Sequence, residues 1–145
     1  MSAKSLVFGP DGVARLRMGM THQQVSKTDS GRVYVGSRHD GWRRGCRILQ
    51  YHRNQLGRTP GNTLNGVVSD KHGLERLYAT PRMVTPEGIS LGSTILEVRD
   101  AYDRPRLTSG DGIVVPASDR TVYRIQVGGV VTSMSLEVRD PDCTI

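Results

Sequence analysis

One short pattern occurs twice in this sequence, and it constrains the fold more than any other feature. Residues 85–94 read TPEGISLGST, while residues 9–13 read GPDGV and residues 18–21 read MGMT. The positions that match are Met18, Gly19, Thr21 and Val25 with Leu91, Gly92, Thr94 and Val98, a constant 73 residues apart. The repetition favours two copies of one small unit. The alternative is a chance similarity between two glycine-bounded helix starts.

Each position in this pattern has a local physical role. The Pro and Gly residues of GPDG and TPEG suit tight turns, because proline fixes φ and glycine permits positive φ. Thr21 and Thr94 are good N-cap residues, and Gln24 and Glu97 stand three residues later, which is the capping-box spacing. The sequence therefore predicts two short helices, one beginning after each threonine.

Alternating apolar and polar residues predict strands after each helix. The firmest are residues 46–51, residues 74–79, and a hairpin of residues 121–127 and 130–139 joined by Gly128-Gly129. We therefore expect an α+β fold, in which two tandem helix-plus-antiparallel-meander repeats form a concave sheet with the helices on one face. The expected division is a flexible lead-in at 1–8, repeat 1 at 9–83 and repeat 2 at 84–145, within one compact domain.

The segments MGMTHQQV (18–25) and LGSTILEV (91–98), each followed by a predicted meander, resemble a known family. They are similar to the tandem-repeat β-lactamase inhibitory proteins and to the single-unit outer-membrane assembly lipoproteins of the SmpA/OmlA type. The resemblance covers most of residues 9–138. It implies a bacterial protein with a concave antiparallel sheet, export to the envelope or the exterior, and binding of proteins without catalysis.

The chain has two cysteines, Cys46 and Cys143. A disulfide between them would close a long loop and fix the polar C-terminal segment, and it would favour an oxidising compartment. The alternative is two unrelated thiols. Residues 1–8 lack the apolar stretch of a signal peptide, so the protein is either cytoplasmic or has lost a signal segment. We expect it to be secreted or in the cell envelope, with the cytoplasm as the alternative.

Positive charge is concentrated in the first part of the chain. Residues 1–60 contain 11 Lys and Arg against 3 acidic residues, whereas residues 61–145 contain 9 against 11. Between Gly36 and Gly45 the sequence combines arginines with the only tryptophan, a combination that is enriched in binding hot spots. The expected binding residues are Arg38, Trp42, Arg43, Arg44 and Arg47. For the positive charge taken by itself, we favour a solvated basic face over an anionic partner.

No pattern in the sequence indicates catalysis. The four histidines lack metal-binding spacing, there is no Cys-x-x-Cys pair, and no phosphate-binding glycine motif occurs. We therefore expect no enzyme activity, no cofactor and no metal. The predicted function is a protein-interaction module that binds an unidentified protein through its sheet face and basic loops. A small basic intracellular protein that binds nucleic acid is the alternative, because the basic segment would suit an anionic partner.

Overall fold

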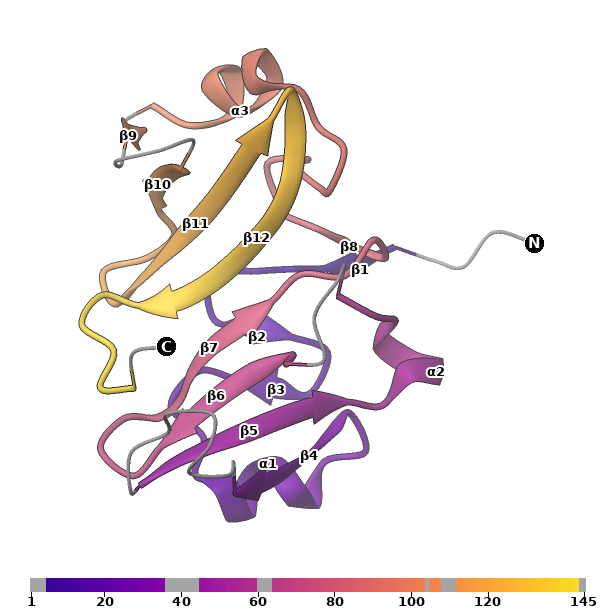
Figure 1. Cartoon of the computed structure of the whole chain (residues 1–145), viewed down its shortest axis with the longest axis vertical. Coiled ribbons are helices and arrows are strands. Elements are labelled where there is room, and N and C mark those ends of the chain that lie inside the picture. The colour runs from indigo at the N-terminus through magenta and orange to yellow at the C-terminus, as the bar shows by residue number, and fades with distance from the viewer. Residues whose placement is uncertain (1–4, 36–44, 60–63, 104, 108–111, 144–145) are drawn as a thin grey trace.

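The computed structural model describes residues 5–35, 45–59, 64–103, 105–107 and 112–143. It is mostly β, with 44% strand and 13% helix (Figure 1). The helices are α1 (His22–Lys27), α2 (Arg53–Leu56) and α3 (Ile95–Ala101). The strands are β1 (Leu6–Val7), β2 (Gly12–Val13), β3 (Leu16–Arg17), β4 (Gly31–Val35), β5 (Cys46–Tyr51), β6 (Gly66–Ser69), β7 (Gly73–Tyr78), β8 (Met83–Val84), β9 (Arg106–Leu107), β10 (Gly112–Pro116), β11 (Thr121–Gly128) and β12 (Val130–Val138).

Eight of the described strands form one antiparallel sheet. Its order is β4-β5-β6-β7-β12-β11-β10-β9, and the pairing of β7 with β12 places Leu77 opposite Leu136. Two small pairs lie outside this sheet: β1 runs parallel to β8, and β2 forms a hairpin with β3. The pairing of β7 with β12 joins the group β4-β5-β6-β7 to the group β12-β11-β10-β9 in one hydrogen-bonded layer.

The predicted fold class is wrong. We expected an α+β fold of two helix-plus-meander repeats, but the protein is mostly β and is organised around one large antiparallel sheet. The physical reason is the size of the helices: α1 has 6 residues and α3 has 7, and each buries a single apolar residue, Val25 or Val98. The strands supply most of the core. The division at 9–83 and 84–145 stays a prediction.

The predicted helix starts are confirmed. Thr21 caps α1 and Thr94 caps α3, each accepting a hydrogen bond from the backbone N–H three residues on. The side chains of Gln24 and Glu97 accept in return from the backbone N–H of the capping threonine. Both caps are thus complete capping boxes, which matters because helices this short are marginal without them.

Replacement of Thr94 by alanine will lower the free energy of unfolding by about 1 kcal/mol, since the N–H of Glu97 loses its acceptor. Thr94→Ser keeps the hydroxyl and is the matched control, with an expected change of a few tenths of a kcal/mol at most. Urea denaturation followed by circular dichroism measures both variants. Equal stability of the alanine and serine variants would show that the cap contributes nothing.

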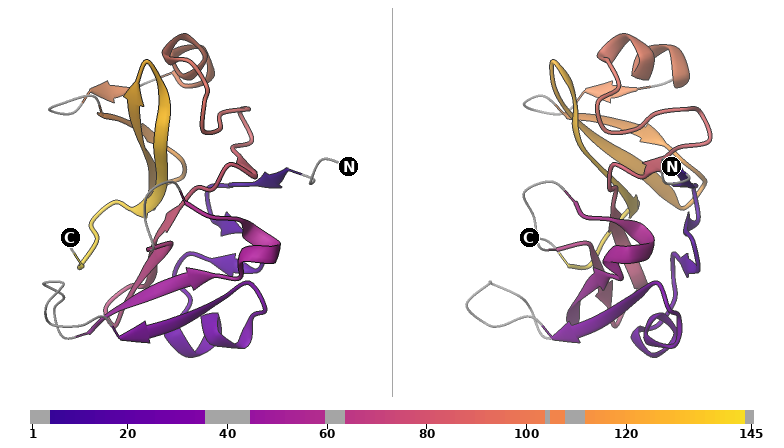
Figure 2. Two further views of the ribbon diagram at one scale, coloured as in Figure 1. Left: turned by 45° about the vertical axis from the view of Figure 1, so that its right-hand side comes forward. Right: turned by 90° about the vertical axis from the view of Figure 1, so that its right-hand side faces the viewer.

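The core lies on one face of the sheet. Because side chains alternate along a strand, Leu49, Leu77, Leu136 and Ile125 share this face, and all are fully buried. Phe8, Leu16, Val25 and Val98 pack in the same cluster from the N-terminal strands and the helices. Figure 2 shows the indigo N-terminal strands on one side of the sheet and the yellow C-terminal segment on the other.

Three buried tyrosines tie the core to distant backbone. The hydroxyl of Tyr123 donates to the carbonyl of Phe8 at 2.7 Å, and that of Tyr51 donates to the carbonyl of Tyr78 at 2.6 Å. The hydroxyl of Tyr102 bonds to the Thr85 hydroxyl at 3.0 Å. Burial raises the pKa of all three phenols; for Tyr102 it reaches about 12, with the Thr85 bond acting in the opposite direction. Each phenol is therefore neutral in the folded protein at neutral pH.

The stability of the protein will fall as the pH rises above 10. The pKa of Tyr102 is raised from 10.0 to about 12 in the folded state, so the unfolded chain releases this proton first and is favoured between these values. Below pH 10 this contribution to stability is fully present. Ultraviolet absorbance of tyrosinate, recorded beside circular dichroism, measures the effect. Ionisation of Tyr102 near pH 10 in the intact fold would contradict it, and Tyr102→Phe identifies its signal.

Candidate binding surfaces

The face of the sheet opposite the core is rich in polar side chains, and we call it the polar face. The register places on it Arg32, Gln50, Arg76, Arg124, Gln126, Ser133, Ser135 and Glu137. Arg32, Arg124 and Gln126 are exposed, whereas Ser135 and Glu137 are buried. The buried apolar residues Ile48, Val67 and Val122 share this face, so its hydrogen-bonding groups stand among apolar ones.

A charged network occupies the centre of the polar face. One carboxylate oxygen of Glu137 accepts from Arg76 at 3.2 Å and from Arg124 at 3.0 Å. Its other oxygen accepts from the hydroxyl of Ser135 at 2.8 Å. The Glu137 side chain is only 5% exposed, so the three donors replace the water it has lost.

The network carries more positive than negative charge. Two arginines surround one carboxylate, and Nε of Arg76 is buried with no hydrogen-bond partner in the described part of the chain. The Arg124 side chain is 48% exposed and reaches solvent, while that of Arg76 is 12% exposed. The centre of the polar face therefore presents the positively charged side chain of Arg124, which the buried carboxylate of Glu137 holds in position.

The C-terminal segment crosses the same side of the sheet and is held covalently. Cys46 and Cys143 form a disulfide, as one interpretation of the sequence expected, with a Cα–Cα distance of 6.0 Å. The carboxylate of Glu75, which is fully buried, accepts from the backbone N–H groups of Asp142 and Cys143 at 3.1 and 2.8 Å. The bridge favours an oxidising, extracytoplasmic environment.

Of the binding residues expected from the sequence, Arg38, Trp42, Arg43 and Arg44 lie outside the described residues. Arg47 is described: it lies on β5, and its guanidinium bonds to Asp70 at 2.5 Å with 24% of the side chain exposed. It is therefore already engaged within the chain. The contact role of all five stays a prediction.

The residues of the central network were not found from the sequence. One part of the signal was present, because the alternation of residues 121–127 places Arg124 and Gln126 on one face. Arg76 and Glu137 stand 61 residues apart, and nothing local indicates that they pair. The available signal for Arg76 and for Glu137 was that each is a charged residue next to an apolar residue within a predicted strand.

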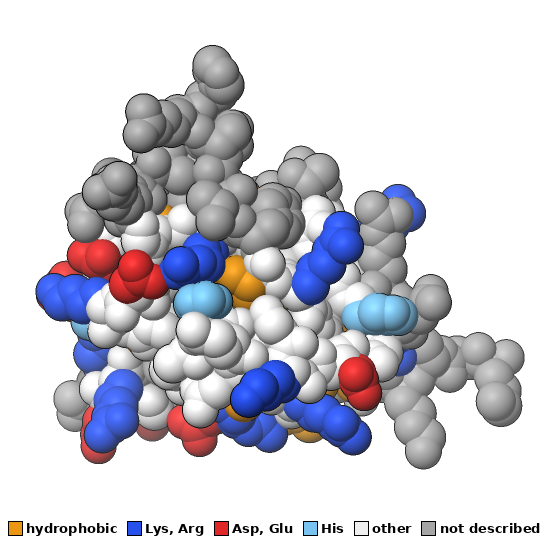
Figure 3. Space-filling model, turned by 90° about the horizontal axis from the view of Figure 1, so that it is seen from below, with side chains coloured by type: hydrophobic (Ala, Val, Ile, Leu, Met, Phe, Trp, Pro, Cys, Tyr) orange, Lys and Arg blue, Asp and Glu red, His pale blue; other side chains and the backbone are white. Residues whose placement is uncertain are grey.

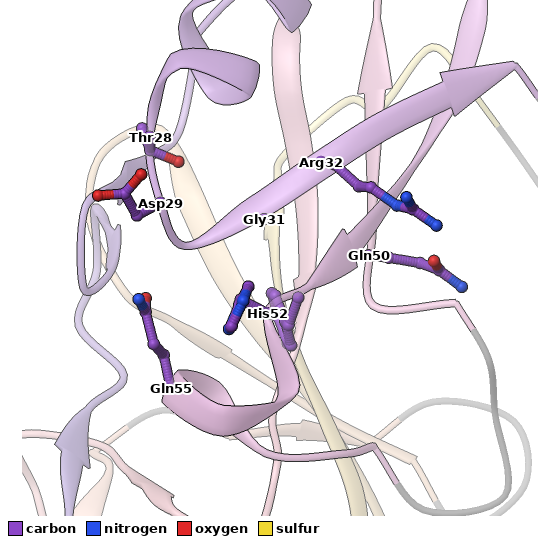
Figure 4. Close-up of a pocket in the computed structure, with 8 residues that line it drawn as sticks. Thr28, Asp29, Gly31, Arg32, Gln50, His52 and Gln55 are labelled. Carbon is purple, nitrogen blue, oxygen red and sulfur yellow. The ribbon is translucent and has the colours of Figure 1, made fainter.

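An open groove lies at the beginning of β4. Its volume is about 810 Å³, and it is lined by Thr28, Asp29, Gly31, Arg32, Gln50, Tyr51, His52 and Gln55. Figure 4 shows Asp29, His52 and Gln55 around one opening, while Arg32 and Gln50 project from the other side of the strands. The lining is dominated by amide, carboxylate, imidazole and hydroxyl groups. Such a surface suits hydrogen bonding to a polar ligand.

The described residues do not group into a metal centre, since no three His, Cys, Asp or Glu side chains among them are placed to hold an ion. Every helix in the same residues is too short or too polar to span a bilayer. Searches against protein-family models, curated proteins and solved structures found no match. The resemblance to the β-lactamase inhibitory proteins therefore stays a prediction.

Proposed function

We propose that the protein is a non-catalytic interaction module of the secreted fraction or the cell envelope, which binds a protein partner through its polar face and basic loops. The observation that supports this most is the central network. Arg124 stands exposed above a buried carboxylate that fixes its position, and a preorganised arginine is a frequent hot spot in protein interfaces.

The face also has the composition of an interface rather than of a catalytic cleft. Gln126 and Ser133 lie beside the network and offer neutral hydrogen-bonding groups around the charged centre. The disulfide supports an extracytoplasmic setting, where such a bridge persists, and argues against the intracellular nucleic-acid-binding alternative. The basic loop with Arg38, Trp42, Arg43 and Arg44 adds further contacts in this proposal.

The test captures partners from the secreted and envelope fractions of the producing organism with immobilised oxidised protein. The captured protein is identified by mass spectrometry, and its affinity is measured with purified components. Arg124→Gln will weaken this affinity about tenfold or more, because the central cation is lost. Arg99→Gln is the matched control: Arg99 is exposed on α3, away from the polar face, and its loss will leave the affinity unchanged.

Equal affinity of the Arg124→Gln and Arg99→Gln variants would remove the polar face from the interaction. Labelled duplex DNA provides the comparison with the alternative function. Binding to phosphates would weaken by about 0.9 log units per log unit of salt for each phosphate neutralised. Tight, salt-sensitive DNA binding without any captured protein would favour the nucleic-acid function instead.

A further inference from the structure

Among the described strands, β4 stands first in the sheet order and has a paired neighbour, β5, on one side only. It pairs with β5 in a regular antiparallel register that places Gly31 opposite Tyr51 and Val33 opposite Leu49. The other terminal strand, β9, has only two residues. A sheet edge of five residues presents backbone groups that another extended segment can pair with.

Three hydrogen bonds determine which backbone groups of β4 face outward. The N–H of His52 donates to the carbonyl of Ser30, so this opposed pair is hydrogen-bonded. The carbonyl of Leu49 and the N–H of Tyr51 instead bond to Asn65, on the β6 side of β5. Because bonded and non-bonded pairs alternate in an antiparallel ladder, the N–H and C=O groups of Gly31 and Val33 point away from β5.

The groove described above continues this edge. Gly31 and Arg32 belong to β4 and also line the groove. Asp29 and His52 line the groove at its opening. An extended segment that paired with Gly31 and Val33 would therefore enter a polar groove at the start of the strand.

The charge around this edge selects the kind of segment. Lys27 and Arg32 are exposed, and Arg15 lies 3.9 Å from Asp29, so three basic residues stand against one acid. Figure 3, which views the molecule from the side of α1 and β4, shows Lys and Arg side chains spread across this surface and predominating over acidic ones. Two copies of the edge would repel each other, whereas an acidic segment would be attracted.

We propose that β4 binds an extended acidic segment of a protein partner, which adds to the sheet as a further strand. The segment exchanges backbone hydrogen bonds with Gly31 and Val33, and its carboxylates lie against Arg32. Its end occupies the groove beside Asp29 and His52. This inference rests on the proposed protein-binding function and specifies the chemistry of the partner. The surface lies apart from Arg124, because four strands separate β4 from β11 in the sheet.

A short peptide of alternating Glu and Val is the probe, and amide hydrogen exchange is the readout. At saturating peptide, exchange will slow at the amides of Gly31 and Val33 and will change little at Arg32, whose N–H already faces β5. A peptide of alternating Lys and Val is the charge control and will bind about tenfold more weakly or less. The acidic peptide methylated on alternate backbone nitrogens keeps its charge but will also lose about tenfold, because it cannot donate to the edge.

The matching change in the protein is Val33→Pro, which removes the outward N–H and leaves the bonds to β5 untouched. Proline is tolerated at such solvent-facing positions of edge strands, and Val33→Thr is the control that keeps the N–H. Val33→Pro will weaken peptide binding about tenfold, while Val33→Thr will bind like the wild type. The methylated peptide gives an independent answer should the proline variant fail to fold.

Several results would overturn the inference. The first is that the acidic peptide does not bind at about 1 mM, a concentration typical of weak association. The others are that the methylated peptide or the basic peptide binds as tightly as the unmodified acidic peptide. Protection of Gly31 and Val33 that rises with protein concentration alone, with a dimer in sedimentation, would assign the edge to a second copy. Arg99→Gln, at an exposed position of α3, leaves peptide binding intact. The peptide test reads only the β4 edge and the capture test reads the polar face, so a failure of one is separable from a failure of the other.

Discussion

Reduction of the disulfide between Cys46 and Cys143 will lower the free energy of unfolding by about 4–5 kcal/mol. The two cysteines are 97 residues apart, so the bridge removes much of the conformational freedom of the unfolded chain. This is a large part of the 5–15 kcal/mol that stabilises a typical domain. The reduced protein is therefore expected to be marginally stable at physiological temperature.

Urea denaturation of the oxidised and reduced wild type measures this effect directly. The double variant Cys46→Ala/Cys143→Ala is the matched control, because reductant should not change its stability. The variant also leaves a small cavity, since both side chains are buried beside Val67, and will therefore be slightly less stable than the reduced wild type. A difference between oxidised and reduced protein below about 1 kcal/mol would contradict the chain-entropy argument.

The same experiment has a local readout. In the oxidised protein the backbone N–H groups of Asp142 and Cys143 bond to the buried carboxylate of Glu75. Without the bridge the segment is held only by non-covalent contacts such as these bonds, so its amides will exchange faster than those of β7 and β12. Unchanged exchange at both amides after reduction would show that the non-covalent contacts are sufficient to hold the segment in place.

Glu137→Gln will lower the free energy of unfolding by about 3–5 kcal/mol. The substitution keeps the shape of the side chain but removes the negative charge that Arg76 and Arg124 share. Arg76 is then left largely buried with no counter-charge, and its Nε has no partner in the described part of the chain even in the wild type. The penalty comes from this uncompensated buried cation rather than from the lost bonds themselves.

Glu87→Gln is the matched control, because Glu87 is exposed and the change is expected to cost less than about 0.5 kcal/mol. The double variant Arg76→Met/Glu137→Gln removes both buried charges and will recover much of the loss, which a double-mutant cycle measures as coupling. A double variant as unstable as the sum of the two single variants would refute the electrostatic explanation.

Local features of the fold could be predicted from the sequence, and the long-range ones could not. The capping boxes at Thr21 and Thr94 and the hairpin of β11 and β12 depend on residues close together in the chain, and the structure contains them. The pairing of β7 with β12 joins segments about 60 residues apart, and no local pattern specifies it. The predicted fold class is wrong because it extended a local similarity at the helix starts to the whole architecture.

The candidate surfaces show the same division. Alternation along β11 indicated that Arg124 and Gln126 share a face. It did not indicate that Arg124 pairs with Glu137 on β12, or that Arg76 on β7 shares the same carboxylate. The position of β4 at the end of the order of the described strands is a property of the assembled sheet, which no local pattern specifies. Composition pointed to Arg38, Trp42, Arg43 and Arg44, and these contacts stay predictions.

The positions of the bonds along the chain have a consequence for biosynthesis. Synthesis proceeds from the N-terminus, so the carbonyl of Phe8 can accept the hydrogen bond from Tyr123 only after residue 123 has been made. In the same way, Cys46 can form its disulfide only after Cys143 has been made. Until then the growing polypeptide holds an open thiol and an unfilled acceptor near its beginning. The disulfide therefore forms only near the end of synthesis or after it. Newly made chains in which it has not yet formed are the form most exposed to proteases and to wrong disulfide pairing.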